Sequence, residues 1–338
     1  MDDTTLTHVI TAPAPQSQSV FLTDLSATIT DYILSCLPAT GEPLSAPAHH
    51  HFAKAGKQLR ARMAIAAGDC FNVPRQSSLA WAAAVELLHN ASLVHDDICD
   101  GDAVRRGQPA IWAKYGKDTA LALGDWMIAT AFSQACIAAE TSHTPQLVSV
   151  LAKHMSDTTQ GQAQEFEISS YPDWNEYMDI STGKTAPLFI APVEGISLMA
   201  RRHDMTAPLT RFFTAAGGCY QIANDMLNVR GSDGADNPAS DLIRRAPNAV
   251  IVMFRNTLDT PSRALFNQFL AQADNQHAGK WQHRIQHSTA LGMTAKALMN
   301  MLEEAEISCA ALPHDCQAII APIEAQLRSV CQRLTQGL

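Results

Sequence analysis

The sequence predicts an all-α protein. Alanine is abundant and runs of β-branched residues are short, so few stretches favour strands. Residues 79–98 are rich in Ala, Leu and Val and place polar side chains at helical spacing. Three amphipathic patterns near the C-terminus, at roughly 259–275, 281–307 and 315–335, indicate further helices that each bury one face. We therefore expect a helical bundle.

Composition narrows the class of protein. The chain has 338 residues, ample for a large core, and only 17% are charged, so many side chains must pack between helices. A net charge of -9 without a basic stripe argues against a nucleic-acid partner. Eight scattered cysteines, without CxxC pairs, indicate free thiols. With neither a secretory signal nor a membrane-spanning run expected, we predict a soluble, cytoplasmic protein.

The domain organisation is expected to be simple. Residues 1–18, rich in Thr, Pro and Ser, predict a flexible tail, and residues 19–338 predict one all-α domain. Its first helix is expected over 21–37, closed by Pro38 and Gly41. A long alanine-rich helix is expected to start near Asp118.

The stretch 86–107, ELLHNASLVHDDICDGDAVRRG, carries acidic, imidazole and guanidinium groups on an otherwise apolar helix. Ser77 and Ser78 are plausible N-caps of this helix. On a 3.6-residue period four polar residues fall on one stripe, with Asp97 about 100° round from it; the stripe consists of His89, Ser92, Asp96 and Asp100.

This stripe indicates a metal and phosphate site. Asp96 and Asp100, at i and i+4, can reach one cation, and carboxylate oxygens favour Mg²⁺ over zinc. Arg105 and Arg106 follow at once and suit a phosphate ester. The alternative interpretation is a solvated acidic helix end followed by two surface arginines, with His89 a core histidine.

Two other stretches carry polar groups on apolar patterns. In GKQLRAR, Lys57 and Arg60 share a helical face and could clamp a diphosphate, or could form a basic surface turn. Pro187 is expected to break or kink a helix and so present Lys184 and Thr185 to a cavity. The alternative is a snorkelling lysine at an ordinary helix break. A second stripe consists of Gln221, Asn224 and Asn228, with Asp225 beside it.

Taken together, the runs GKQLRAR, HNASLVHDDICD and RRGQPAIW resemble the trans-isoprenyl diphosphate synthase (polyprenyl synthetase) family. The resemblance spans about Lys57 to Asp241. It implies a single-domain, isoprenoid synthase-type all-α bundle around a central cavity, and a homodimer whose interface includes the helix from Asp118.

The chain departs from the family pattern in three places. Ala61 stands where the family usually has Pro. Asn224, Asp225 and Asn228 stand where the family has a second DDxxD, so this second aspartate-rich motif is degenerate. Ala246 replaces a family lysine, for which Arg244 or Arg245 could substitute.

The resemblance also implies roles for individual residues. Three Mg²⁺ ions would be held by two sets of ligands, Asp96, Asp97 and Asp100 on one side and the weaker Asn224 and Asp225 on the other. Isopentenyl diphosphate would be bound by Lys57, Arg60, His89 and Arg106. Arg105 would lie on the allylic diphosphate, and further substrate contacts would come from Lys184, Thr185 and Gln221. Catalysis would rest on Asp96, Asp100, Arg105 and Lys184, while Gln162 and Glu165 resemble the family's GQxxE/D element.

The expected reaction is condensation of an allylic diphosphate with isopentenyl diphosphate to a longer trans-polyprenyl diphosphate. Ala91, the fifth residue before the first motif, is expected on the same side of the helix as Asp96, at the floor of the product cavity beside Leu88. A small residue there favours products of C20 or longer.

Two other functions remain open. Asn224, Asn228 and Ser232 have the spacing of the metal triad of terpene synthases, which suggests a diphosphate lyase or cyclase, although Ser232 replaces a Glu. A non-catalytic partner subunit is favoured by the degenerate motif and by Ala246, and opposed by the intact first motif.

Overall fold

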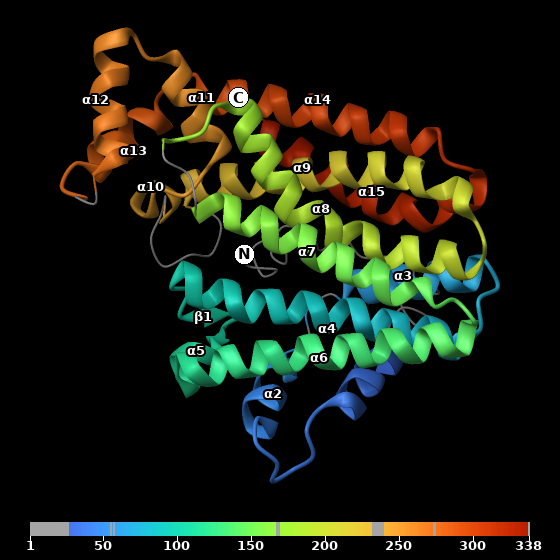
Figure 1. The fold of residues 1–338 in the computed structure, drawn as a ribbon. Coiled ribbons are helices and arrows are strands. Elements are labelled where there is room, and N and C mark those ends of the chain that lie inside the picture. The colour runs from blue at the N-terminus through green and yellow to red at the C-terminus, as the bar shows by residue number, and fades with distance from the viewer. Residues whose placement is uncertain are drawn as a thin grey trace. The chain divides into compact units, whose positions relative to one another are not determined.

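The computed structural model describes residues 27–54, 56, 58–166, 170–231, 240–272 and 275–336. These residues are almost entirely helical, which confirms the predicted all-α class (Figure 1). The described chain divides into two compact units. The first draws on Met1–Met155, Leu188–Ala207 and Pro313–Ile319, and the second on Ser156–Pro187, Pro208–Leu312 and Ile320–Leu338.

The first unit contains the first polar motif. Residues 27–36 are helical, within the helix expected over 21–37, whereas the tail expected over 1–18 lies outside the described residues. The unit continues through α2 (Ser45–Phe52), α3 (Leu59–Cys70), α4 (Arg75–Asp100), α5 (Ile111–Tyr115) and α6 (Lys117–Ser142). It also holds the start of α7 (Gln146–Phe166), the end of α8 (Trp174–Met199) and the short 3-10 helix η1 (His203–Met205).

Helix α4 is the long apolar helix predicted around the first motif, but its start differs. Pro74 is the N-cap residue, and no side chain caps the helix, so the predicted serine caps are wrong. Ser77 lies inside the first turn, where its hydroxyl donates to Thr141 Oγ1 of α6 at 2.8 Å. The helix ends at Gly101, whose positive φ of 71° suits a glycine at a C-terminus.

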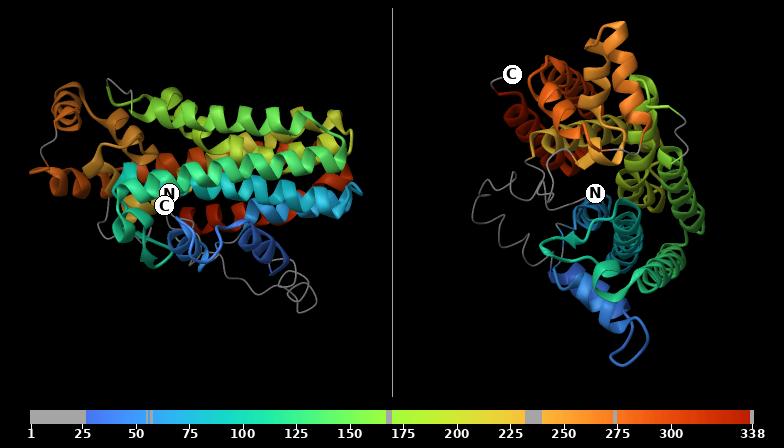
Figure 2. Two further views of the ribbon diagram at one scale, coloured as in Figure 1. Left: turned by 60° about the horizontal axis from the view of Figure 1, so that its bottom comes forward. Right: turned by 90° about the vertical axis from the view of Figure 1, so that its left-hand side faces the viewer.

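Helices α4 and α6 lie side by side, as both views of the ribbon show (Figures 1 and 2). Gly124 of α6 makes the close approach possible, because a Cβ there would overlap the imidazole ring of His95. Among the described helices, α6 alone is long and apolar enough to cross a membrane by composition, a test that core helices also pass.

A two-stranded hairpin connects α4 to α5, and the sequence did not predict it. Strands β1 (Val104–Arg105) and β2 (Gln108–Pro109) pair antiparallel. The two loop residues, Arg106 and Gly107, have φ values of 52° and 68°. Positive φ at both positions matches the turn that joins tight hairpins. The hairpin turns the chain back immediately after the aspartates of α4.

The second unit is also helical. It comprises parts of α7, α8 and α15 together with α9 (Thr206–Arg230), α10 (Ser240–Arg244), α11 (Ala249–Thr257), α12 (Thr260–Ala271), α13 (Ala278–Gln286) and α14 (Ala290–Ala310). Helix α15 (His314–Thr335) matches the last predicted helix. The single helix expected over 281–307 is wrong, because the chain turns at Ser288, whose hydroxyl accepts the N–H of Ala290.

Helix α8 continues through Pro187, so the predicted break is wrong. Close to this proline, α7 and α8 meet backbone to backbone in the second unit. A Cβ on Gly161 would lie 2.5 Å from the carbonyl carbon of Gly183 and 2.5 Å from the backbone nitrogen of Lys184. Pro187 cannot donate to the Gly183 carbonyl, and the packed glycine lies beside that carbonyl. Gly161 therefore fixes the position of Lys184 relative to α7.

We predict that Gly161→Ala lowers the free energy of unfolding by about 1–3 kcal/mol, because the added methyl group meets backbone that cannot rotate away. Gly183→Ala is the matched control, since its Cβ would meet only the Cα of Gly161, at 3.7 Å. Urea unfolding followed by circular dichroism measures both. Equal losses in the two variants would contradict the close approach of α7 and α8.

Candidate functional site

The last turns of α4 hold three aspartates in different surroundings. Because α4 is one continuous helix, Asp96 and Asp100 lie one turn apart on the same face, and both are partly exposed. Asp97 is only 1% exposed. The neighbouring carboxylates of Asp96 and Asp97 therefore differ in what they can bind.

Asp97 is paired with Arg105 of the hairpin. Nε of Arg105 donates to Oδ1 at 2.8 Å and to Oδ2 at 2.9 Å, and Nη2 donates to Oδ1 as well. Arg105 is 4% exposed, so both members of the ion pair are buried. Burial raises the pKa of Asp97, and the hydrogen bonds and charge of Arg105 oppose that rise. No observation tests the predicted contacts of Arg105 with a diphosphate and of Asp97 with a metal. Because the two side chains bind each other, our proposal assigns neither of them to a ligand.

The hairpin is also fastened to α2. The side chain of Gln108 donates to the carbonyl of His50 at 2.9 Å, and Nε2 of His50 donates to the carbonyl of Pro109 at 2.9 Å. Arg106, 8% exposed, donates through Nη1 to the carbonyl of Lys54 at 3.4 Å. These bonds hold Arg106 between the hairpin and α2.

A cationic cluster surrounds His89. Burial, followed by the positive charges of Arg60, Arg106 and Arg105, lowers the pKa of His89 well below its ordinary value. The imidazole is therefore neutral among guanidinium groups. Arg60 itself lies over the ring of Phe189, with Cζ 4.3 Å from the ring centroid. A group of arginines with a neutral donor suits a phosphate ligand. Lys57 lies outside the described residues.

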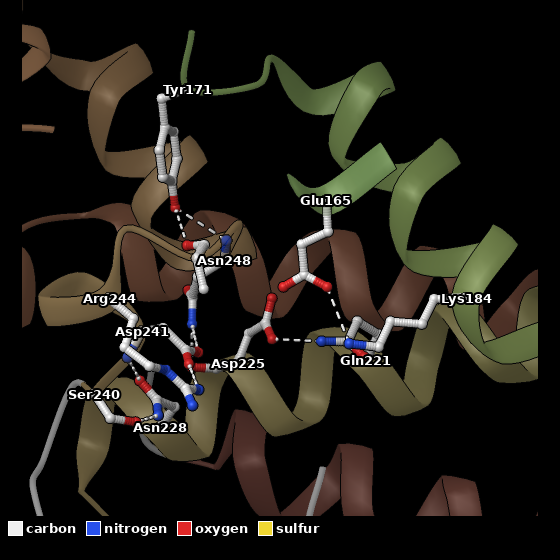
Figure 3. A network of polar contacts seen from close by, with 11 residues as sticks. Glu165, Tyr171, Lys184, Gln221, Asp225, Asn228, Ser240, Asp241, Arg244 and Asn248 are labelled. Atoms are coloured by element: carbon white, nitrogen blue, oxygen red, sulfur yellow. Dashed lines mark hydrogen bonds and ion pairs between the residues drawn. The ribbon is translucent and has the colours of Figure 1, made fainter. Parts of the chain in front are cut away.

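The second motif lies on α9, where Asp225 is the centre of a hydrogen-bond network (Figure 3). The hydroxyl of Tyr177 donates to Oδ2 at 2.7 Å, the amide of Gln221 donates to Oδ1 at 2.9 Å, and the N–H of Ala249 donates to Oδ2 at 2.7 Å. Burial, and then the negative charge of Asp241, raise the pKa of Asp225 well above its ordinary value. Its oxygens are already engaged by groups of the protein.

Asp241 and Asn248 extend this network. The amide of Asn248 donates to Asp241 Oδ2 at 2.8 Å, while Asn248 Oδ1 accepts the N–H of Val250 and caps α11. Arg244 donates to Asp241 Oδ1 at 3.1 Å (Figure 3). Arg245 instead stacks on Phe269, with Cζ 3.9 Å from the ring centroid. Of the two arginines considered as substitutes for a family lysine at Ala246, Arg244 is the one in the network.

Both polar atoms of the Asn228 side chain form hydrogen bonds within the protein. Its amide donates to the hydroxyl of Ser240 at 2.8 Å, and its Oδ1 accepts the N–H of Asp241 at 3.4 Å. Asn224 differs from its neighbours, because its buried Oδ1 has no hydrogen-bond partner among the described residues. An orphaned oxygen of this kind suits a cation or a water held by one.

Lys184 of α8 forms an ion pair with Glu165 of α7, with Nζ 3.0 Å from Oε2 (Figure 3). Thr185 beside it is buried. Within the described part of the chain, Oε1 of Gln221 and both polar atoms of the Gln162 amide are buried without a hydrogen-bond partner. The second unit therefore presents unsatisfied amides from α7 and α9, which a bound polar ligand would satisfy.

The sequence predicted the residues of both stripes, but it missed their partners. Tyr177 and Asn248 were not singled out, and Asp241 was noted only as the end of the resemblance, because nothing in the spacing indicates that these residues belong to the network around Asp225. In the first unit, Glu86 and Asn90 read as part of the apolar helix, although both are buried and polar. A buried carboxylate in such a helix was the one available signal.

The residues expected at the cavity floor are buried, with Ala91 0% and Leu88 4% exposed. In a continuous helix, however, five residues turn about 140° beyond a full revolution. Ala91 therefore does not share the face of Asp96, as the sequence interpretation assumed. It lies within about 40° of His95, the residue that packs on α6. The role of Ala91 in chain length stays a prediction.

The fit to magnesium can be judged from these donors. In the described ranges, no group of three or more His, Cys, Asp or Glu side chains is close enough to hold a metal ion. Asp96 and Asp100 fit a hard cation that keeps most of its water, because two partly exposed carboxylates are one turn apart. Asn224 offers a neutral oxygen, and Asp225 is occupied by protein donors.

Comparison with known proteins gives a consistent result. The model of the family described as polyprenyl synthetase matches residues 42–287. A geranylgeranyl diphosphate synthase of Saccharolobus solfataricus is 29% identical over 243 residues, covering 70% of this chain and 73% of that protein. An all-trans-nonaprenyl-diphosphate synthase (geranyl-diphosphate specific) of Rhodobacter capsulatus is 29% identical over 269 residues, covering 76% of this chain and 80% of that protein.

Solved structures agree on the fold. A decaprenyl diphosphate synthase from Rhodobacter capsulatus superposes with a TM-score of 0.82 at 20% identity, covering 95% of this chain and 99% of that chain. A polyprenyl synthase from Caulobacter crescentus CB15, complexed with calcium and isoprenyl diphosphate, gives 0.78 at 22% identity, covering 94% and 96%. These likenesses confirm the predicted isoprenoid synthase-type all-α fold.

We predict that Asp97→Ala lowers the free energy of unfolding by about 3–5 kcal/mol, since it leaves Arg105 as a buried, unpaired charge. Asp96→Ala, one residue away and partly exposed, is the matched control and is expected to cost less than about 1 kcal/mol. Chemical unfolding measures both. Should the two substitutions cost the same, the buried ion pair does not have the structural role assigned to it.

Proposed function

The chain belongs to the polyprenyl synthetase family and is a prenyltransferase, and we propose that it extends an allylic diphosphate with isopentenyl diphosphate. The product is a longer trans-polyprenyl diphosphate. One observation carries the proposal: α4 presents Asp96 and Asp100 as partly exposed carboxylates on one face, while Asp97 is withdrawn to hold the arginine-bearing hairpin. This arrangement supports the proposal, because a metal-bound diphosphate requires acidic groups for the metal and basic groups for the phosphates.

We propose that Mg²⁺ is bound by Asp96 and Asp100, with Asn224 as the oxygen donor of the second motif and three ions in all. Bound Mg²⁺ neutralises the charge of the diphosphate leaving group. Asp225 keeps its bonds to Tyr177, Gln221 and Ala249 and orders the end of α9. In this proposal, each motif has residues that bind the metal and an aspartate, Asp97 or Asp225, whose carboxylate is bound by other groups of the protein.

The basic residues bind the two substrates. Isopentenyl diphosphate is held by Lys57, Arg60, His89 and Arg106, the neutral His89 donating one hydrogen bond. The allylic diphosphate is held by Lys184, Thr185 and Gln221. Arg105 contributes by holding Asp97, so we assign it a positioning role. These contacts align the double bond of isopentenyl diphosphate with the allylic carbon.

The proposed reaction breaks one C–O bond, forms one C–C bond and releases one proton. The C–O bond of the allylic substrate breaks and its electron pair leaves with diphosphate. The π electrons of isopentenyl diphosphate form the new C–C bond, and loss of a proton to the released diphosphate restores a double bond. The guanidinium groups stabilise the diphosphates, and apolar side chains of the helices keep water from the allylic cation.

We further propose a homodimer that forms through α6 in the cytoplasm. The outward side of α6 exposes the small or apolar residues Leu121, Ala122, Ala129 and Cys136, interspersed with the exposed Asp125 and Glu140. Leu121 is 48% exposed. A second copy would cover this face.

The test is an assay of purified protein with Mg²⁺, geranyl or farnesyl diphosphate, and labelled isopentenyl diphosphate. We expect label in longer diphosphates, and chelation by EDTA should abolish it. Hydrocarbon or alcohol without isopentenyl incorporation would identify a diphosphate lyase or cyclase. Absence of any turnover would indicate a non-catalytic partner subunit, the function that the neutral side chains of Asn224 and Asn228 favour. The Ser232 of the cyclase interpretation lies outside the described residues.

Asn224→Asp should lower the Mg²⁺ concentration for half-maximal activity by about fivefold or more, because a charged oxygen adds at least ~1 kcal/mol of attraction to the cation. Asn228→Asp is the control at the same motif. Its side chain is bound to Ser240 and to the N–H of Asp241, so we expect no shift in Mg²⁺ dependence. A shift in the Asn228 variant alone would reverse the assignment of the metal donor.

We propose that Ala91 contributes to the floor of the product cavity although it does not share the face of Asp96. Ala91→Phe should then shorten the product, because Ala91 is 0% exposed and a phenyl ring must take space from the cavity. Ala91→Gly keeps the space open and should leave the C20 or longer products unchanged. Chromatography of dephosphorylated products measures chain length, and thermal unfolding shows whether each variant is folded. An unchanged product from folded Ala91→Phe enzyme would remove Ala91 from the floor.

A further inference from the structure

Three consecutive histidines lie in the last turn of α2, and their rings bind three different parts of the first unit. Nδ1 of His49 donates to the carbonyl of Ser45 in the same helix at 2.8 Å. Nε2 of His51 donates to Oδ1 of Asn90 in α4 at 2.9 Å. His50, between them, binds the end of β2. The last turn of α2 therefore contacts its own helix, the hairpin and α4.

His50 binds β2 through both its ring and its backbone. Its Nε2 donates to the carbonyl of Pro109 at 2.9 Å, and its carbonyl accepts the side-chain amide of Gln108 at 2.9 Å. Because the carbonyl of Pro109 can only accept, the ring proton of His50 is on Nε2. Nδ1 then accepts a hydrogen bond from Nζ of Lys114 in α5 at 3.0 Å. The two partners therefore select the tautomer of His50 that binds β2.

The two strands of the hairpin have separate anchors. Arg105 of β1 is bound by Asp97 of α4, and β2 is bound by His50 of α2. Arg106 lies in the turn between the strands. With the first anchor alone, the hairpin could rotate about the ion pair of Arg105. Anchors on both strands fix the direction of the turn.

The guanidinium of Arg106 lies where the hairpin approaches both α2 and the cationic cluster around His89. Nζ of Lys54 donates to the carbonyl of Gly107 at 3.1 Å, and Nη1 of Arg106 donates to the carbonyl of Lys54 at 3.4 Å. The charge of Arg106 adds to burial in lowering the pKa of His51 to about 3. It also contributes to the lowered pKa of His89. The direction of the turn therefore determines how this cluster is assembled.

We propose that His50 is a positioning residue for isopentenyl diphosphate. It fixes β2, and through β2 it fixes the direction in which the turn presents Arg106 to the ligand. The inference rests on the proposed function for the identity of the ligand, and on the two bonds between His50 and β2 for the geometry. When these bonds are lost, Arg106 spends less time directed at the diphosphate, so the diphosphate binds more weakly.

Position 50 allows the ring contact to be removed and restored. His50→Leu deletes the ring donor and keeps an apolar side chain of similar bulk. In His50→Gln, the Nε2 of glutamine is as many bonds from Cβ as the Nε2 of histidine, so a donor to the Pro109 carbonyl is retained. His49→Leu is the matched control, because the ring of His49 binds a carbonyl of its own helix. On the hairpin, Gln108→Met removes the donor to the His50 carbonyl.

A hydrogen bond between neutral groups contributes roughly a two- to tenfold change in an equilibrium. We expect His50→Leu and Gln108→Met each to raise the KM for isopentenyl diphosphate about fivefold. The KM for the allylic substrate and the saturated kcat should change less than about twofold, as should every parameter of His49→Leu. His50→Gln should bring the KM for isopentenyl diphosphate back to within about twofold of the wild-type value.

A merely structural histidine would give a different pattern. The proposal is overturned by an unchanged KM for isopentenyl diphosphate in folded His50→Leu, by equal rises in both KM values, by a fall in kcat alone, or by failure of His50→Gln to restore the KM. Circular dichroism shows whether each variant is folded. If His50→Leu does not fold, Gln108→Met decides: a rise in the KM for isopentenyl diphosphate alone supports the proposal, and any other result overturns it.

The failure of this inference is distinguishable from failure of the proposed function. If the wild-type protein transfers no isopentenyl group, the proposed function fails, and calorimetric binding of inorganic diphosphate with Mg²⁺ then tests the positioning role. Binding that is about fivefold weaker in His50→Leu, but not in His49→Leu, supports that role. Equal binding by the wild type and both variants, or no binding by the wild type, overturns it.

Discussion

The buried ion pair between Asp97 and Arg105 determines how the rest of the first motif is arranged. Two charges taken out of water are tolerated only when each satisfies the other. Here the single Nε–H of Arg105 is shared between both oxygens of Asp97, and Nη2 donates to Oδ1 as well. The pair fastens the hairpin to the last turn of α4. It thereby fixes where Arg106 lies. In our proposal Asp96 and Asp100, on the adjacent face of the helix, bind the ligand.

In the second unit, too, one residue of the motif is bound by the protein and its neighbour is not, but here hydrogen bonds take the place of an ion pair. Asp225 accepts three hydrogen bonds from groups of three helices and is withdrawn from solvent. Asn224, beside it, keeps an oxygen that no described group satisfies. The carboxylate that remains in the degenerate motif is therefore bound by groups of the protein, and we propose that the neutral side chain of Asn224 faces the ligand. Such an exchange predicts weaker metal binding on this side than two aspartates would give.

Sequence periodicity predicted those features that depend only on residues close together in the sequence. The helix around the first motif, the pairing of Asp96 with Asp100 and the last helix all follow from spacing alone. The hairpin did not, because Gly107 was its only signal among residues that fit many turns. The different surroundings of Asp96 and Asp97 were also seen only in the structure. Asp97 is buried against Arg105 of the hairpin, whereas Asp96 is partly exposed.

Tertiary packing overrode local rules in other places. Pro187 does not end α8, which runs without interruption from Trp174 to Met199. Ala91 lies about 140° from Asp96, because five residues of an α-helix turn through about 500°. The sequence interpretation had placed the two residues on the same side of the helix. Glu86 lies within an apolar run of the sequence, and its hydrogen bond from the N–H of Ala61 at the start of α3 is seen only in the structure.

The most direct test of the account is a crystal structure of the protein with Mg²⁺ and inorganic diphosphate. The account predicts that Asp96 and Asp100 contact the metal, while Asp97 keeps both oxygens on Arg105. A structure in which Asp97 coordinates the ion and Arg105 has moved onto the diphosphate would contradict it.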